Sequence, residues 1–192
     1  MSSSSSSNLK MRNSGLEPLP TTYYLFFAVV EPLLTFAGAG RAYFDAAQYF
    51  VELYPARLTT APTLKVAGLH PAAPTAVRQL GSCFFLFALL ACILLPTMRR
   101  TLANQPAELE RLVKAYLGCL AAADLTHIGA TMWDLGPQGS QNVSAWNVLT
   151  WGNIGITAVL FSVRMLWFIG IARRRRGRRR RGGRRSNAPR SF

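Results

Sequence analysis

The chain has 192 residues, half of them apolar, and a formal net charge of +14. Eleven of its 22 Lys and Arg residues lie after residue 172, so the rest of the chain is apolar and close to neutral. This segregation of charge excludes an ordinary soluble domain and favours a membrane protein with a basic tail.

The first twenty residues are polar and rich in serine, and they lack the basic, apolar and small-residue pattern of a cleavable signal peptide. We therefore expect residues 1–20 to form a disordered leader. The first apolar segment should act as an uncleaved signal anchor.

Crossing a bilayer takes roughly 20 apolar residues in a helix. Four segments meet this requirement, and they are residues 21–44, 75–96, 112–132 and 146–172. The third is the least apolar because it contains Asp124 and His127. The sequence therefore predicts an all-α fold, a four-transmembrane-helix bundle over residues 21–172, followed by a disordered arginine-rich tail over residues 173–192.

The orientation follows from the excess of Lys and Arg that marks cytoplasmic segments. Seventeen of these residues lie in the N-terminus, the second connection and the tail, whereas three lie in or beside the first connection. This predicts cytoplasmic N- and C-termini, in the endoplasmic reticulum or another endomembrane. Residues 45–74 then form a long lumenal loop.

A shorter lumenal loop is expected between Met132 and Trp146. It contains the sequon Asn142-Val-Ser144, which lies so close to the fourth segment that we do not expect Asn142 to be glycosylated.

Polar side chains inside the predicted helices are the features most relevant to function, because ionisable groups at bilayer depth are costly and usually face the bundle interior. Within each helix they share one face by spacing. The predicted intramembrane cluster consists of Glu31, Asp124, His127, Asn153, Thr157 and Arg164.

Depth suggests how these side chains pair. At about 1.5 Å per residue, Glu31 lies about 20 Å and Arg164 about 24 Å from the lumenal helix ends, which predicts an ion pair. His127 and Asn153 lie nearer the lumen, with Asp124 between the two levels. We therefore expect a second, hydrogen-bonded group of Asp124, His127 and Asn153.

Three interpretations of the cluster remain open. It holds the helices together through interhelical hydrogen bonds; it forms a ligand or catalytic pocket, with Glu31, Asp124 and His127 as candidate acid and base groups; or the same three residues bind a metal, although no paired histidine motif supports this. We expect no bound metal and no cofactor. The three cysteines lie in apolar runs, where thiols behave as small hydrophobic groups.

The arginine tail begins at the membrane boundary. Its first residues, Arg173, Arg174, Arg175 and Arg176, are expected to lie on anionic lipid head groups. Aromatic residues for base stacking do not alternate with the arginines, so we expect no nucleic-acid partner.

Several motifs in order resemble a family of small fungal membrane proteins defined by a domain of unknown function. These motifs are Glu31-Pro32 with Gly38-Ala39, Asp124-Leu-Thr-His127, Trp146-Asn147, Trp151-Gly-Asn-Ile-Gly-Ile-Thr157 and Arg164. The resemblance implies a fungal origin and four helices, and it implies no activity. In size and in bearing buried acids the chain is also loosely similar to sterol isomerase bundles and fungal membrane terpene cyclases.

Two functions fit these features best. A third, transport of protons or small solutes, would also use an intramembrane carboxylate, but the sequence shows no sign of inverted repeats. In the first, a non-enzymatic helical bundle in the lipid bilayer binds a hydrophobic small molecule, a lipid or a partner helix. In the second, a sterol or terpenoid isomerase or cyclase uses Asp124 or Glu31, kept protonated by burial, as an acid and His127 as a base.

Overall fold

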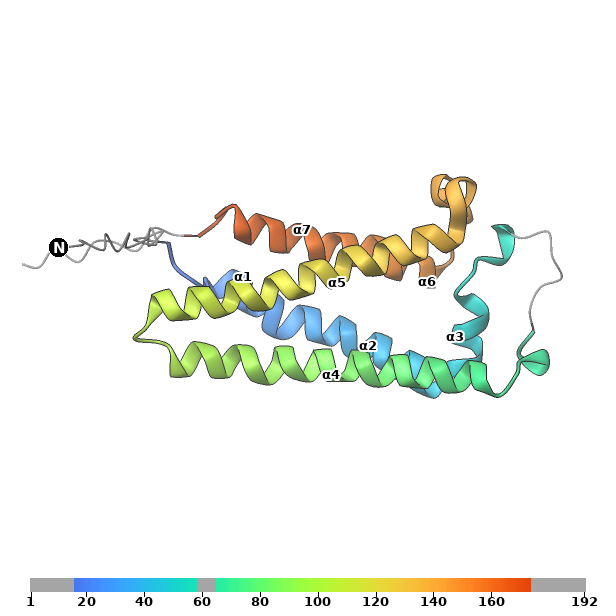
Figure 1. Ribbon diagram of the computed structural model, residues 1–192, viewed down its shortest axis with the longest axis horizontal. Helices are drawn as coiled ribbons and strands as arrows, with labels where there is room; N and C mark the ends of the chain where they lie inside the picture. Colours follow the sequence, from blue (N-terminus) through green and yellow to red (C-terminus); the bar gives the residue numbers. More distant parts are fainter. Residues whose placement is uncertain (1–15, 59–64, 174–192) are drawn as a thin grey trace, which may run out of the picture.

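The computed structural model describes residues 16–58 and 65–173, and all regular structure within these two ranges is helical (Figure 1). The long helical segments form rods that lie side by side along the long axis of the molecule. The expected tail from residue 174 onward lies outside the described residues, as does most of the expected leader. Residues 16–20, which we assigned to the leader, instead pack on the bundle, where Leu19 is buried.

The first rod consists of α1 (Thr21–Leu25), a π-helical segment (Phe26–Val30) and α2 (Glu31–Phe44), in agreement with the predicted segment 21–44. Pro32 has no backbone N–H to donate to the preceding turn. The wider π-helical turn directly before it accommodates this missing hydrogen bond.

The other rods are longer or shorter than their predicted segments. The second is α4 (Ala72–Thr101) and the third is α5 (Pro106–Gln141). The fourth combines α6 (Val148–Thr150), a second π-helical segment (Trp151–Ile156) and α7 (Thr157–Phe168). Helices α4 and α5 exceed their apolar segments because polar residues at their ends continue the backbone hydrogen bonding, whereas the fourth rod is shorter than its predicted segment.

Three rods in the described part of the chain are long and apolar enough to cross a membrane: Thr21–Phe44, Ala72–Thr101 and Val148–Phe168. The third rod, α5, is 36 residues long but is not among them.

The expectation that residues 45–74 form a lumenal loop without regular structure is partly wrong. It contains a further helix, α3 (Ala46–Glu52), and short 3-10 turns at Ala56–Leu58 and Val66–Gly68. An ion pair between Arg41 and Glu52 ties α3 to α2, and Asn147 Nδ2 donates a hydrogen bond of 2.7 Å to the Glu52 carbonyl. Burial raises the pKa of Tyr49 in α3, although the nearby Arg41 charge opposes this shift.

The shorter expected loop is also largely helical. The regular part of α5 continues past Met132 to Gly136, where the backbone takes φ 67° and ψ 177°. Glycine adopts this conformation without a Cβ penalty, and Pro137 then begins another short helical stretch.

The backbones of α2 and α4 approach each other closely at Gly81. A Cβ added to Gly81 of α4 would lie 3.1 Å from the Ala39 carbonyl oxygen and 3.2 Å from the Ala42 Cβ. By contrast, nothing lies within 4 Å of such an atom at Gly40, Gly118 or Gly152. The small-residue contact therefore depends on Gly81.

The hydrophobic core has two parts. The larger lies at the end of the bundle where the described chain begins and ends, and its members are Leu19, Tyr23, Phe27, Ala28, Leu95, Met98, Leu109, Val113, Leu117 and Trp167. The smaller lies at the opposite end, around Tyr49, Val77 and Leu149. The polar side chains described next lie outside both clusters.

Candidate functional site

Three charged residues from three different helices meet inside the bundle. Glu31 is the first residue of α2, Asp124 lies in α5 and Arg164 lies in α7. Their relative exposures are 6%, 8% and 2%, so all three are buried. We call this group the Arg164 triad.

The guanidinium group of Arg164 bridges the two carboxylates. Its Nη2 donates a hydrogen bond of 2.5 Å to Glu31 Oε1, and its Nη1 donates another to Asp124 Oδ2. Arginine suits this position because its planar group presents several donors in a fixed geometry and keeps its charge when buried. The triad thereby links α2, α5 and α7.

The charges and hydrogen bonds of the triad are not balanced. Two carboxylates face one guanidinium, and no other Lys or Arg of the described residues forms an ion pair with them. Glu31 Oε2 and Arg164 Nε are buried and have no hydrogen-bond partner within the described residues. Unpaired buried polar atoms are costly, so these two require an explanation.

The expected Glu31 and Arg164 pair is thus present, but the place of Asp124 differs from our expectation. We placed Asp124 nearer the lumenal end because we ended its helix at Met132. The regular helix continues to Leu135, which adds about 4 Å of depth at 1.5 Å per residue. This accounts for part of the difference in depth, and the long side chain of Arg164, whose Nη1 donates a hydrogen bond to Asp124 Oδ2, spans the rest.

The expected hydrogen-bonded group of Asp124, His127 and Asn153 is not formed. No hydrogen bond within the part of the chain that the structure describes joins these three side chains. The His127 ring instead meets Phe84 of α4 edge to face, with ring centroids 6.4 Å apart. Thr157 is separate as well, since its hydroxyl donates to the Gly152 carbonyl at 3.4 Å.

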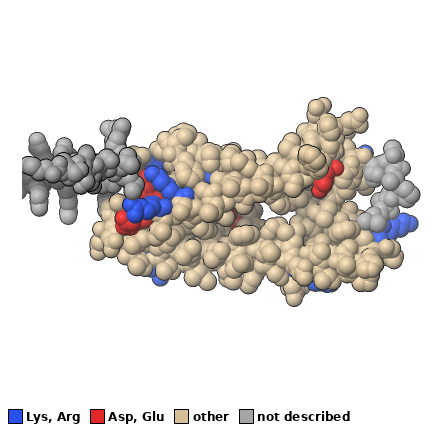
Figure 2. Space-filling view, viewed as in Figure 1, with Lys and Arg blue, Asp and Glu red and all other residues tan. Residues whose placement is uncertain are grey.

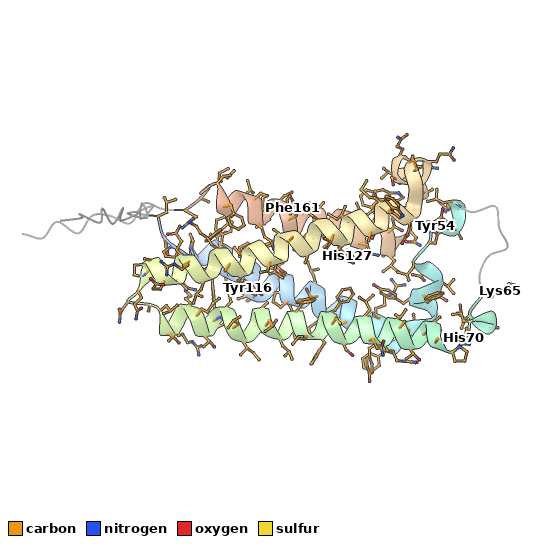
Figure 3. The ribbon with its side chains drawn as sticks, viewed as in Figure 1. Tyr54, Lys65, His70, Tyr116, His127 and Phe161 are labelled. Carbon is orange, nitrogen blue, oxygen red and sulfur yellow. The ribbon has the colours of Figure 1, made fainter. Side chains whose placement is uncertain are left out.

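A hollow lies next to the triad, between α4 and α5. Figure 2 shows the surface hollowed between these two layers of the molecule. The side chains of Tyr116 and His127 extend from α5 into the space on the α4 side (Figure 3). We call the space bordered by Tyr116, His127, Phe84 and Cys92 the α4–α5 hollow.

Tyr116 connects the hollow to the triad and was missed by the sequence interpretation. It lies within electrostatic reach of Glu31 and Arg164, and also of Cys92 on α4. Its position eight residues before Asp124 places both on one face of α5. This spacing was the available signal, but a single tyrosine in an apolar helix carries little weight by itself.

The metal interpretation of the cluster is not supported. Among residues 16–58 and 65–173, no group of three His, Cys, Asp or Glu residues is placed to hold a metal ion. Glu31 and Asp124 are together, but His127 points to Phe84 instead.

Arg173 does not lie on a lipid surface as we expected. It is buried, its Nη2 donates to Glu110 Oε1 at 2.8 Å, and its Nε donates to the Glu17 carbonyl at 3.0 Å. Its guanidinium also lies 4.5 Å from the centre of the Trp167 ring. The expected lipid contacts of Arg174, Arg175 and Arg176 lie outside the described residues.

These features define an all-helical protein with three helices long and apolar enough to cross a membrane and a buried ion triad between helices. The chain belongs to the family of the domain of unknown function DUF7704, which matches residues 16–174. All three triad residues lie within the matched region. No curated protein and no solved structure matches the chain.

Proposed function

We propose that the protein is a multi-pass membrane protein with four crossings and cytoplasmic termini, residing in the endoplasmic reticulum or another endomembrane. The fourth crossing is α5. Its low average hydropathy is due in part to Asp124, which is buried against Arg164 and would not face lipid. An even number of crossings is also consistent with the contact of Arg173 with the Glu17 carbonyl, which brings the two ends of the described chain together.

The biochemical role that we propose is non-enzymatic binding of a hydrophobic small molecule, a lipid or a partner helix in the α4–α5 hollow. The observation that carries this proposal is the juxtaposition of the hollow with the Arg164 triad. The triad fixes α2, α5 and α7 to one another, whereas α4 and α5 leave the hollow between them (Figure 2). Sites between helices of a bundle are common places for apolar ligands.

The two histidines of the chain provide a matched test of this binding site. His127 borders the hollow, whereas His70 is exposed just before α4. In a His127→Trp variant the indole would fill the hollow, and we expect the amount of co-purifying lipid or small apolar molecule to fall. A His70→Trp variant should retain it. Equal amounts in both variants, measured by mass spectrometry of the purified protein, would contradict the proposal.

The four crossings are tested separately with a glycosylation reporter. The reporter is fused after Gln105, after Ser144 or at the C-terminus. We expect glycosylation of the second fusion alone, because only that position is lumenal when α5 crosses the membrane. An unmodified reporter after Ser144 would show that α5 does not cross.

A second candidate function is acid catalysis on a sterol or terpenoid, as in an isomerase or cyclase. The observation that favours it is the unpaired Glu31 Oε2 beside the hollow. Against it, Arg164 already donates a hydrogen bond to one oxygen of each carboxylate, and His127, the expected base, packs against Phe84 instead. Comparing the sterols and terpenoids of a deletion strain with those of a strain carrying Glu31→Gln tests this function, which requires the same product to be lost in both.

For the tail beyond Arg173 we propose contact with anionic lipid head groups, because ten arginines follow residue 173. The resemblance noted above supports a fungal origin for the chain.

A further inference from the structure

The Arg164 triad has a surplus of one negative charge in its ionised form. Arg164 already donates from both terminal nitrogens, one to each carboxylate. Glu31 Oε2 remains without a partner in residues 16–58 and 65–173, although the side chain is only 8% exposed. In a region of low dielectric, both the surplus charge and the unpaired acceptor favour a cationic hydrogen-bond donor as a further occupant.

The surroundings of Glu31 indicate where this occupant comes from. Tyr116 lies within electrostatic reach of Glu31, and its side chain extends from α5 toward α4 (Figure 3). Tyr116 therefore lies close to both the triad and the α4–α5 hollow. The rings of Tyr116 and Phe84 suit a cation with an apolar body, because aromatic faces attract positive charge and aromatic edges pack against alkyl groups.

We propose that the ligand of the α4–α5 hollow is a lipophilic amine, whose protonated nitrogen pairs with Glu31 Oε2 and whose apolar part lies between α4 and α5. This inference rests on the proposed binding function and names the chemical class of its ligand. An ammonium group neutralises the surplus charge and donates the missing hydrogen bond. An alcohol would donate the bond but leave the charge, and a carboxylate would add repulsion.

Three probes with the same alkyl chain isolate the contribution of the head group: dodecylamine, dodecanol and dodecanoate. Their binding to the purified full chain in a mild detergent at neutral pH is measured by competition against a fluorescent alkylamine. We expect the amine to bind at least about tenfold more tightly than the alcohol, which corresponds to about 1.4 kcal/mol for one desolvated charge pair. Dodecanoate should bind most weakly.

Three substitutions of acids complete the experiment. Glu31→Gln removes both the charge and the acceptor, and Asp124→Asn removes the surplus charge while retaining Glu31. Both should reduce the preference for amine over alcohol to within about threefold, a loss of roughly 0.7 kcal/mol or more. Glu108→Gln, at an exposed ion pair on α5, is the matched control and should leave the preference unchanged.

The outcomes separate the two proposals. Equal affinity for amine and alcohol, or an unchanged amine preference in both triad variants, overturns the inference while leaving hydrophobic binding in place. Absence of saturable binding by all three probes contradicts the binding function itself. The comparison of probes on the unmodified chain does not require any variant to fold.

Discussion

Arg164 and Glu31 lie 133 positions apart in the sequence and are joined inside the bundle by a hydrogen bond of 2.5 Å. The same guanidinium reaches Asp124, so one cation serves two anions from two other helices. A buried charge needs its partners, because removal of one partner leaves the other in a medium that solvates it poorly. The stability of the bundle should therefore depend strongly on this arginine.

Replacing Arg164 with Leu should destabilise the protein by about 3–5 kcal/mol, because two carboxylates then remain buried without a cation. The triple variant Glu31→Gln, Asp124→Asn, Arg164→Leu should recover much of that loss, since no buried charge is left. The measurement is the free energy of unfolding in mixed detergent micelles. A triple variant less stable than Arg164→Leu would contradict the charge argument and indicate that packing around Arg164 decides stability.

The two carboxylates should behave differently from the arginine. Because the triad carries a surplus negative charge, either Glu31→Gln or Asp124→Asn leaves a neutral pair with Arg164. We expect each to cost at most about 2 kcal/mol, the value of one charge-assisted hydrogen bond. The double variant should cost more than the sum of the two single variants, because Arg164 then lacks any counter-charge. Simple additivity in the same unfolding assay would contradict this coupling.

The position of Asp124 limits what an exchange of the charges of Glu31 and Arg164 can restore. Exchanging Glu31 and Arg164, so that Glu31→Arg accompanies Arg164→Glu, restores the pair between α2 and α7. It also places the new glutamate on α7 beside Asp124. We therefore expect expression to recover only partly, and adding Asp124→Asn to the exchange should recover more.

Close packing of α2 on α4 predicts different effects at two glycines. A methyl group at Gly81 would lie 3.1 Å from the Ala39 carbonyl oxygen, whereas one at Gly118 meets nothing within 4 Å. Gly81→Ala should therefore cost about 1–3 kcal/mol through overpacking. Gly118→Ala should be neutral or stabilising by up to about 1 kcal/mol, because alanine favours the helix. Equal effects of the two substitutions on unfolding would show that α2 and α4 separate easily.

Much of the fold was accessible from the sequence because apolar length is a strong signal. The first segment, residues 21–44, agrees with the helical rod Thr21–Phe44. The pairing of Glu31 with Arg164 was also accessible, since opposite charges at similar depth have few alternatives in a bundle. Both expectations tolerate the π-helical segments Phe26–Val30 and Trp151–Ile156, because these change the rise of the rods only locally.

Other features depend on where helices end, and end positions are weakly encoded. The regular part of α5 continues beyond Met132 and ends only at the positive φ of Gly136, and this brings Asp124 nearer to the depth of Arg164. The helix α3 lies in a stretch rich in proline and polar residues, and its contacts with Arg41 and Asn147 come from distant parts of the chain. Neither the end of the regular part of α5 nor the helix α3 could be predicted from local sequence patterns.

Arg173 gives the last contrast between local pattern and tertiary contact. As the first of a run of arginines it resembles a solvated charge, yet its side chain is 2% exposed and is paired with Glu110, while its guanidinium lies over Trp167. Arg173→Ala should therefore cost about 2–3 kcal/mol of unfolding free energy, because a buried ion pair and a cation–π contact are lost together.

The matched control is Arg111→Ala, since Arg111 forms an ion pair with Glu108 in which both side chains are about half exposed. That substitution should change stability by no more than about 0.5 kcal/mol. Similar effects of the two substitutions would mean that Arg173 contributes as an ordinary surface charge. The contact between residues 16–20 and the end of α7 would then depend on other interactions, such as the hydrogen bond of 3.1 Å from the Trp167 indole nitrogen to the Pro18 carbonyl.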